Sequence, residues 1–369
     1  MRLLATGLLT WFMFGSSITV IAADAAGPEV QIPGTETRTL YSEIVGQEYR
    51  LQISLPPGYR DSGQRSPLVY LLDAQWDFPL VHAIIGEQYY DGFVPGLILV
   101  GLTWGGENPN PDVLRRRDFT PTEEAGAGDS GGGKDFLSFF EQELIPYIDK
   151  HYRTSQNRTL MGSSLGGLFT LYALFTRPDL FDNFIATSPA TPWDNGVIYS
   201  FEKGFSTRSA QHPSRLFIAA SELEELYQPV MKLVDTLRSR DYPGLSWTSH
   251  VVTGSGHSGV KPDGNTRGLQ FAFKRPDLAL TGEDLKPYLG TYQSKGGAAE
   301  VRVSIQDGKL LVHSPFDGQS WIMKAQNKTH FYHEGAFLNV RMLLDDSGQV
   351  TGCVVQTFGN SEAFRKSEH

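Results

Sequence analysis

The sequence predicts an α/β protein with a doubly wound, mostly parallel sheet, followed by a small antiparallel all-β domain. Short apolar segments alternate with segments of helical periodicity up to about residue 276, which is typical of parallel strands joined by crossover helices. From Leu285 onward the helical periodicity disappears, and short strands separated by turn residues replace it. The 369 residues are 40% hydrophobic and 20% charged, which suffices for a large core and an additional smaller one.

The N-terminal residues have the composition of a secretory signal. Arg2 provides a short positive start, an almost uncharged apolar stretch runs from Leu3 to Ile21, and small residues follow it. We therefore expect a signal peptide over residues 1–25 and a mature protein that is secreted or periplasmic. The alternative is an uncleaved anchor, because the apolar stretch is nearly long enough to span a bilayer. We expect no stable membrane span after cleavage.

The elements of the α/β domain follow from two patterns. Residues 48–55 alternate polar and apolar side chains, as a half-buried strand does, whereas 68–72 and 97–102 are continuously apolar, as central strands are. The strands predicted in this way cover residues 48–55, 68–72, 97–102, 158–162, 216–220 and 247–252. The predicted helices cover residues 76–90, 135–149, 165–176 and 229–240. A glycine-rich stretch at 126–133 is expected to form a loop.

The all-β domain is predicted from two hairpins. Residues 300–306 alternate strictly and are joined to 309–312 by Asp307-Gly308, a favourable hairpin turn. Residues 339–344 and 350–356 flank a second turn at Asp345 to Gly348. We therefore divide the chain into a signal peptide (1–25), an α/β domain (26–276) and an all-β domain (277–369).

Charge and cysteine content exclude some classes of partner and bond. The formal net charge is -9, so the concentrated basic face that binds nucleic acid is not expected. Cys353 is the only cysteine, which makes a disulfide within the chain impossible. It lies in an apolar strand, where a buried and unreactive thiol is expected.

A nucleophile motif lies in the middle of the α/β domain. Gly162-Ser163-Ser164-Leu165-Gly166 matches Gly-x-Ser-x-Gly, the nucleophile elbow of the α/β-hydrolase fold. Serine in this motif occupies a tight turn between a strand and a helix, whose dipole favours developing negative charge. The predicted strand 158–162 and helix 165–176 provide that context. We predict Ser164 as the nucleophile, because Ser163 is not centred between the glycines.

Serine requires a general base, which follows the nucleophile and the acid along the chain in this fold. His257 is the expected base, because it follows the strand 247–252 in a loop of glycines and serines. His250 lies within that strand and is expected to be structural. The acid should follow the strand 216–220.

Three carboxylates are candidates for the acid, in Ser221-Glu222-Leu223-Glu224-Glu225. Glu222 and Glu224 would point the same way in an extended segment, so their spacing does not separate them. The acid would hold the tautomer of the imidazole and stabilise the imidazolium. The residues alone leave this choice open.

The oxyanion hole requires two backbone donors. One is expected to be the amide of Leu165, directly after the nucleophile. The other should come from the loop after the strand 68–72, from Ala74 or Gln75. A donor of this kind lowers the barrier by about 2.7–4 kcal/mol.

Several further segments agree with a known family. They are Leu55-Pro56-Pro57-Gly58-Tyr59, Tyr70-Leu71-Leu72-Asp73, Arg117-Asp118-Phe119-Thr120-Pro121-Thr122, Leu144-Ile145-Pro146-Tyr147-Ile148, Arg177-Pro178-Asp179-Leu180-Phe181 and Gly256-His257-Ser258-Gly259-Val260. With the elbow, they make the chain up to about residue 275 resemble the putative esterase family of α/β-hydrolases, which includes esterase D and bacterial siderophore esterases. The resemblance implies Ser164 as nucleophile and His257 as base. Relatives have a Gly-x-x-Glu-like segment at this point, which implies Glu224 as the acid, although this chain has Ser221 in place of the glycine.

The predicted function is that of a serine carboxylesterase that hydrolyses a small-molecule carboxylic ester through an acyl-enzyme, with no metal ion and no organic cofactor. A siderophore-type ester is the narrower hypothesis. Trp76, Arg115 and Arg116 are candidate contacts for such a bulky, anionic substrate; alternatively, Arg117 pairs with Asp118 and the other arginines are solvated. An acyltransferase or peptidase with the same triad, or a non-catalytic binding protein on a hydrolase scaffold, are the alternative functions. The oligomeric state is left open.

Overall fold

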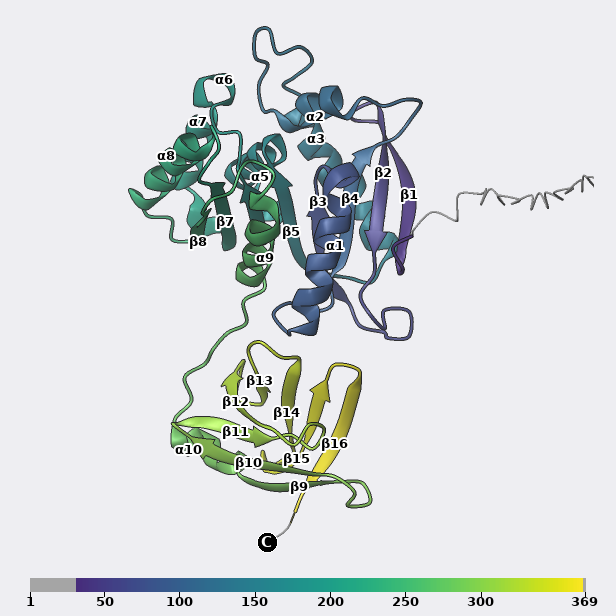
Figure 1. The fold of residues 1–369 in the computed structure, drawn as a ribbon, viewed down its shortest axis with the longest axis vertical. Helices are drawn as coiled ribbons and strands as arrows, with labels where there is room; N and C mark the ends of the chain where they lie inside the picture. Colours follow the sequence, from purple (N-terminus) through teal and green to yellow (C-terminus); the bar gives the residue numbers. More distant parts are fainter. Residues whose placement is uncertain (1–30, 368–369) are drawn as a thin grey trace, which may run out of the picture. The chain divides into compact units, whose positions relative to one another are not determined.

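The computed structural model describes residues 31–367, so the predicted signal peptide (1–25) lies outside the described residues. These residues form an eight-stranded sheet with packed helices and a closed barrel of antiparallel strands (Figure 1). The predicted fold class is therefore confirmed, and the all-β part is in addition a barrel. Within residues 31–367, no helix has both the length and the apolar character needed to cross a membrane.

The strands of the α/β sheet have the order β1-β2-β4-β3-β5-β6-β7-β8. They are β1 (Thr35–Ser42), β2 (Gln47–Ser54), β3 (Ser66–Leu71), β4 (Ile98–Trp104), β5 (Thr154–Ser163), β6 (Asn183–Thr187), β7 (Ser214–Ser221) and β8 (Leu245–Val252). β1, β2 and β4 pair antiparallel, and the remaining neighbours pair parallel. β1 and β6 are not among the strands predicted from the sequence. The five residues of β6 are all buried, but their run is too short and too polar at its ends to show a period.

The helical elements of this part are α1 (Ala74–Tyr90), α2 (Pro111–Phe119), α3 (Gly133–Phe139), η1 (Phe140–Leu144), α4 (Ile145–His151), α5 (Leu165–Thr176), η2 (Pro178–Leu180), α6 (Trp193–Gly196), α7 (Ile198–Ser206), η3 (Ser209–Gln211), α8 (Tyr227–Arg238) and α9 (Val260–Ala272). The helix predicted over 135–149 corresponds to α3, the π-helical turn η1 and α4 in succession. α1 packs against α9, and α5 packs against α2 and α7. α9 lies very close to the sheet: a β-carbon on Gly268 would be 2.6 Å from Ile185 Cγ2.

The C-terminal residues form the barrel, after α10 (Gly282–Leu285) and η4 (Lys286–Tyr288). Its strands are β9 (Gly290–Ser294), β10 (Glu300–Gln306), β11 (Lys309–His313), β12 (Ser320–Ala325), β13 (His330–Tyr332), β14 (Leu338–Leu344), β15 (Val350–Thr357) and β16 (Asn360–Lys366). β16 pairs with β9, so the barrel has no open edge. The inward side chains form their own apolar core. Cys353 is fully buried there, and burial raises the pKa of its thiol to about 12.

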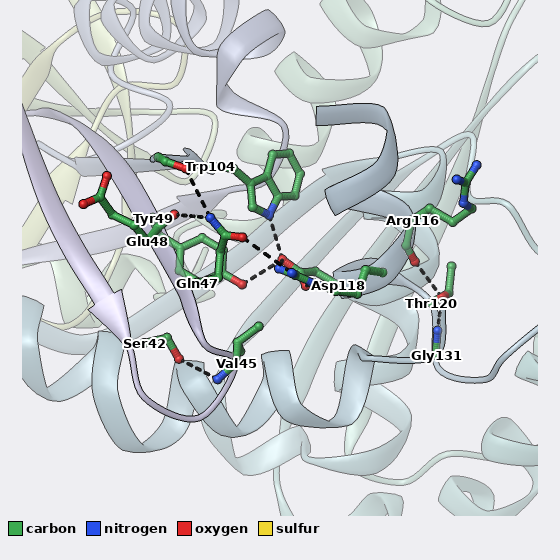
Figure 2. A network of polar contacts seen from close by, with 12 residues as sticks. Ser42, Val45, Gln47, Glu48, Tyr49, Trp104, Arg116, Asp118, Thr120 and Gly131 are labelled. Carbon is green, nitrogen blue, oxygen red and sulfur yellow. Dashed lines mark hydrogen bonds and ion pairs between the residues drawn. The ribbon is translucent and has the colours of Figure 1, made fainter. Parts of the chain in front are cut away.

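A buried carboxylate anchors α2 to the sheet. Asp118 is fully buried and accepts hydrogen bonds at 2.7 Å from the Tyr49 hydroxyl and from the Trp104 indole (Figure 2). Arg117 pairs with the same carboxylate, with 2.7 Å between Nε and Oδ1. Burial, together with this carboxylate, raises the pKa of Tyr49 far above its usual range, so the phenol stays a donor. The network holds in place the helix that also carries Arg115.

Candidate active site

Five neighbouring strands of the sheet end at the same edge. Asp73 follows β3, Ser164 follows β5, Ser188 follows β6, Glu224 follows β7, and His257 follows β8. Because these strands are parallel, their carboxyl ends and the loops after them lie together. The predicted nucleophile, base and acid therefore share one edge of the sheet.

Ser164 occupies a strained turn between β5 and α5. Its φ of 58° and ψ of -118° lie in a region that non-glycine residues rarely adopt. A β-carbon on Gly162 would lie 2.4 Å from the carbonyl oxygen of Gly166, so the turn excludes any larger residue at position 162. Among residues 31–367 no side chain caps α5, so the amides of its first turn, Leu165 included, have no side-chain acceptor there. The local geometry is that of a nucleophile elbow.

His257 contacts a buried carboxylate. Its Nδ1 lies 2.5 Å from Oε2 of Glu224, and the exposed fractions of the two side chains are 45% and 3%. The other oxygen of Glu224, Oε1, accepts a hydrogen bond at 2.9 Å from the amide of Ser221 and another from the hydroxyl of Ser188. The carboxylate is thus held on both oxygens, and it is aimed at the imidazole.

Glu222 lies elsewhere, although its spacing from Glu224 left the two equivalent in the sequence. Its side chain is exposed, and its Oε2 accepts a hydrogen bond at 2.9 Å from the amide of Gly254. The reason is that the chain turns after β7 and does not continue as an extended segment, with Leu223 donating its amide to the carbonyl of Ser255. The turn sends the two carboxylates in different directions.

The loop after β3 lies beside the elbow. Asp73 has a left-handed φ of 57°, and its carbonyl accepts a hydrogen bond from the amide of Trp76. A β-carbon on Gly166 would be 3.4 Å from Oδ2 of Asp73, so this loop touches the first turn of α5. Ala74 and Gln75, the predicted second oxyanion donors, begin α1 at this contact. Both polar atoms of the Gln75 side chain are buried and have no hydrogen-bond partner within residues 31–367.

The two candidate arginines differ in their contacts. Arg115 is bidentate to Asp73, at 3.0 Å from Nε to Oδ1 and 2.7 Å from Nη2 to Oδ2, and its side chain is 15% exposed. Its guanidinium lies 5.7 Å from the ring centroid of Trp76, a side chain that is half exposed. For Arg116, no polar side-chain contact is found in the part of the chain that the structure describes, and its Nε is buried. Arg115 therefore holds the loop after β3, with its charge largely compensated.

Ser188 is not among the site residues predicted from the sequence, because β6 is not among the predicted strands. β6 ends at the same edge of the sheet as the elbow. A short apolar run followed directly by a hydroxyl residue is the sequence signal that could have indicated Ser188. The contact between Asp73 and Arg115 is likewise not indicated by the sequence, because the two residues lie 42 positions apart.

Comparison with known proteins agrees with this geometry. Residues 42–288 match the family model described as "Putative esterase". The chain belongs to this esterase family. The ferri-bacillibactin esterase BesA of Bacillus subtilis (strain 168) is 32% identical over 275 residues, which cover 67% of this chain and 91% of the relative. The siderophore triacetylfusarinine C esterase of Aspergillus fumigatus is 30% identical over 191 residues, or 50% of this chain and 65% of that protein.

Among solved structures, the BES protein from Bacillus cereus superposes with a TM-score of 0.62 at 27% identity, over 68% of this chain and 98% of that one. The family model ends at residue 288, before the first strand of the barrel. This member of the esterase family is therefore an ester-hydrolysing enzyme, with a barrel beyond the part that the family model describes.

Proposed function

We propose that this esterase is a serine carboxylesterase in which Ser164 is the nucleophile, His257 the general base and Glu224 the acid. The observation that carries the proposal is the contact between the buried Glu224 carboxylate and Nδ1 of His257, on the sheet edge that holds the elbow. This contact keeps a proton on Nδ1, so Nε2 is left to accept the proton of the Ser164 hydroxyl. The carboxylate also stabilises the imidazolium that this transfer forms.

Catalysis then follows from the geometry of the turn. The Ser164 oxygen attacks the ester carbonyl, and the amide of Leu165, with that of Ala74 or Gln75, donates to the oxyanion. The imidazolium of His257 gives its proton to the departing alcohol, which leaves an acyl-enzyme on Ser164. Water, deprotonated by the same imidazole, hydrolyses the acyl-enzyme.

The proposed substrate is a siderophore-type ester. The names of the two relatives, a ferri-bacillibactin esterase and a triacetylfusarinine C esterase, support this class. Trp76 offers a half-exposed aromatic face next to the oxyanion loop, which suits a bulky substrate. We propose Arg115 and Arg116 as further contacts. Because Asp73 engages most of the Arg115 guanidinium, we expect Arg115 to act on the substrate mainly through the position of Trp76.

We also propose that the protein is exported and that its mature part has two domains. The composition of residues 1–25 supports export to the periplasm or the medium, where a siderophore ester would be met. We keep the division into an α/β domain (26–276) and an all-β domain (277–369). N-terminal sequencing of the protein secreted by its host would test the cleavage site, and a start at Met1 would contradict it.

The test of the reaction uses Ser164→Ala with a short-chain chromogenic ester and a fluorophosphonate probe. We expect the wild-type protein to hydrolyse the ester and to carry the probe on Ser164, and the variant to do neither. Hydrolysis by the variant would overturn the serine mechanism. In a second assay, wild-type protein receives a ferric tris-catecholate macrolactone, and a kcat/KM below that for the chromogenic ester would overturn the substrate class alone.

A further inference from the structure

The segment after β6 connects the proposed nucleophile to β7, the strand that precedes the proposed acid. The amide of Ser164 donates to the carbonyl of Thr187 at 3.0 Å, and the amide of Ala190 donates to the carbonyl of Ser164 at 3.0 Å. The amide of Ser188, between them, donates to the carbonyl of Ala219 in β7 at 2.8 Å. Any shift of this segment would therefore move the elbow and the acid together.

The side chain of Ser188 completes this connection. Its hydroxyl donates to Oε1 of Glu224, the oxygen that does not face His257. Ser188 is fully buried and the Glu224 side chain is 3% exposed, so water cannot easily replace the hydroxyl. Among the described residues, Oε1 of Glu224 accepts hydrogen bonds from two donors, the hydroxyl of Ser188 and the amide of Ser221.

The backbone of Ser188 is also unusual. Its φ is 43°, in the left-handed region that favours glycine. A serine persists in such a conformation where its surroundings impose it, and strain of this kind gathers at functional sites. Glycine would relieve the strain but could not donate a hydrogen bond from its side chain. The presence of serine here therefore suggests that the hydroxyl is needed.

We propose that Ser188 is a positioning residue for the triad acid, an inference that rests on the proposed serine mechanism. A glutamate has one more rotatable bond than an aspartate, so its carboxylate needs additional contacts to stay aligned with an imidazole. The hydroxyl of Ser188 and the amide of Ser221 fix Oε1 of Glu224, and this orients Oε2 toward Nδ1 of His257. The bond to a buried carboxylate is charge-assisted, which makes it strong and directional.

The test compares Ser188→Ala with Ser188→Gly. Both variants lose the hydroxyl, but glycine adopts the left-handed backbone without strain, so Ser188→Gly should unfold at a higher temperature than Ser188→Ala. For a lost charge-assisted bond we expect kcat to fall about 10- to 100-fold in both variants, roughly 1.4–2.7 kcal/mol, with KM within about twofold. The inference is wrong if kcat follows thermal stability, so that Ser188→Gly has wild-type kcat and only Ser188→Ala is slow. It is also wrong if both variants have wild-type kcat.

A combined variant tests whether Ser188 acts through the acid. In a Glu224→Gln background, adding Ser188→Ala should change kcat by less than about threefold, because the shared effect is already lost. A further loss as large as in the wild-type background would contradict a positioning role. Thr191→Val is the matched control. Thr191 is fully buried in the same loop and its Oγ1 has no hydrogen-bond partner in the described part of the chain, so kcat should stay within about twofold.

The same assay includes Ser164→Ala, which separates this inference from the proposed function. Residual hydrolysis by Ser164→Ala would refute the serine mechanism, and the role of Ser188 with it. An inactive Ser164→Ala together with fully active Ser188 variants would refute the role of Ser188 alone.

Discussion

Replacing Glu224 by glutamine tests the acid directly. Glutamine keeps the size of the side chain and removes its charge, so the imidazolium of His257 loses the carboxylate that now lies 2.5 Å from Nδ1. Two unit charges whose centres are about 4 Å apart attract by roughly 4 kcal/mol at an effective dielectric constant of about 20. Since 1.36 kcal/mol corresponds to about tenfold in rate, this interaction is equivalent to roughly a thousandfold.

The solvent exposure of the imidazole lowers this figure. The His257 side chain is 45% exposed, and solvent screens its charge, so we expect a fall in kcat of about 10²- to 10³-fold. Hydrolysis of a short-chain chromogenic ester measures kcat, and circular dichroism checks that the variant is folded.

Glu222→Gln is the comparison, because glutamine can still accept the hydrogen bond from the amide of Gly254. We expect its kcat to stay within about threefold of wild type. A loss at Glu222 as large as at Glu224, or a Glu224→Gln variant with more than about a third of wild-type kcat, would refute the assignment of the acid.

Three further predictions concern the elbow, a buried ion pair and acid stability. Gly162→Ala should destabilise the protein by about 2 kcal/mol and slow fluorophosphonate labelling, because its β-carbon collides with backbone; unchanged labelling would contradict this. Arg115→Met leaves the buried carboxylate of Asp73 without its ion-pair partner and should lower the free energy of unfolding in urea by about 3 kcal/mol. An unchanged urea midpoint would show that the pair is dispensable. The hydrogen bond from the hydroxyl of Tyr152 lowers the pKa of Glu36 below its ordinary value of 4.5. The stability that this bond contributes is therefore fully present above pH 4.5 and is lost as the pH falls through the lowered pKa of Glu36. Tyr152→Phe should therefore cost about 1 kcal/mol at pH 7 and less below about pH 4, and a cost independent of pH would contradict the linkage.

The sequence by itself determined the fold class and singled out Ser164 as the proposed nucleophile. Apolar runs and helical spacing are local properties of the chain, and so is the strand–turn–helix context of Gly162 to Gly166. The elbow can be recognised without any distant partner, because a side chain at position 162 would collide with the carbonyl oxygen of Gly166, only four residues away. His257 is predicted as the base for a similar reason, since chain order limits the base to one loop.

The tertiary structure decided which residues surround Ser164. The choice between Glu222 and Glu224 depends on a turn after β7 whose direction is set by hydrogen bonds to a loop some thirty residues further along. Ser188 lies 36 positions before Glu224, and Arg115 lies 42 positions after Asp73. Spacing along the chain carries no information about contacts of this kind, because they form only when separate strands end at the same edge of a sheet. Ser164 is thus indicated by its neighbours in sequence. Glu224 is implied by the family resemblance, whereas the hydroxyl of Ser188 that would orient it is identified only by its neighbours in space.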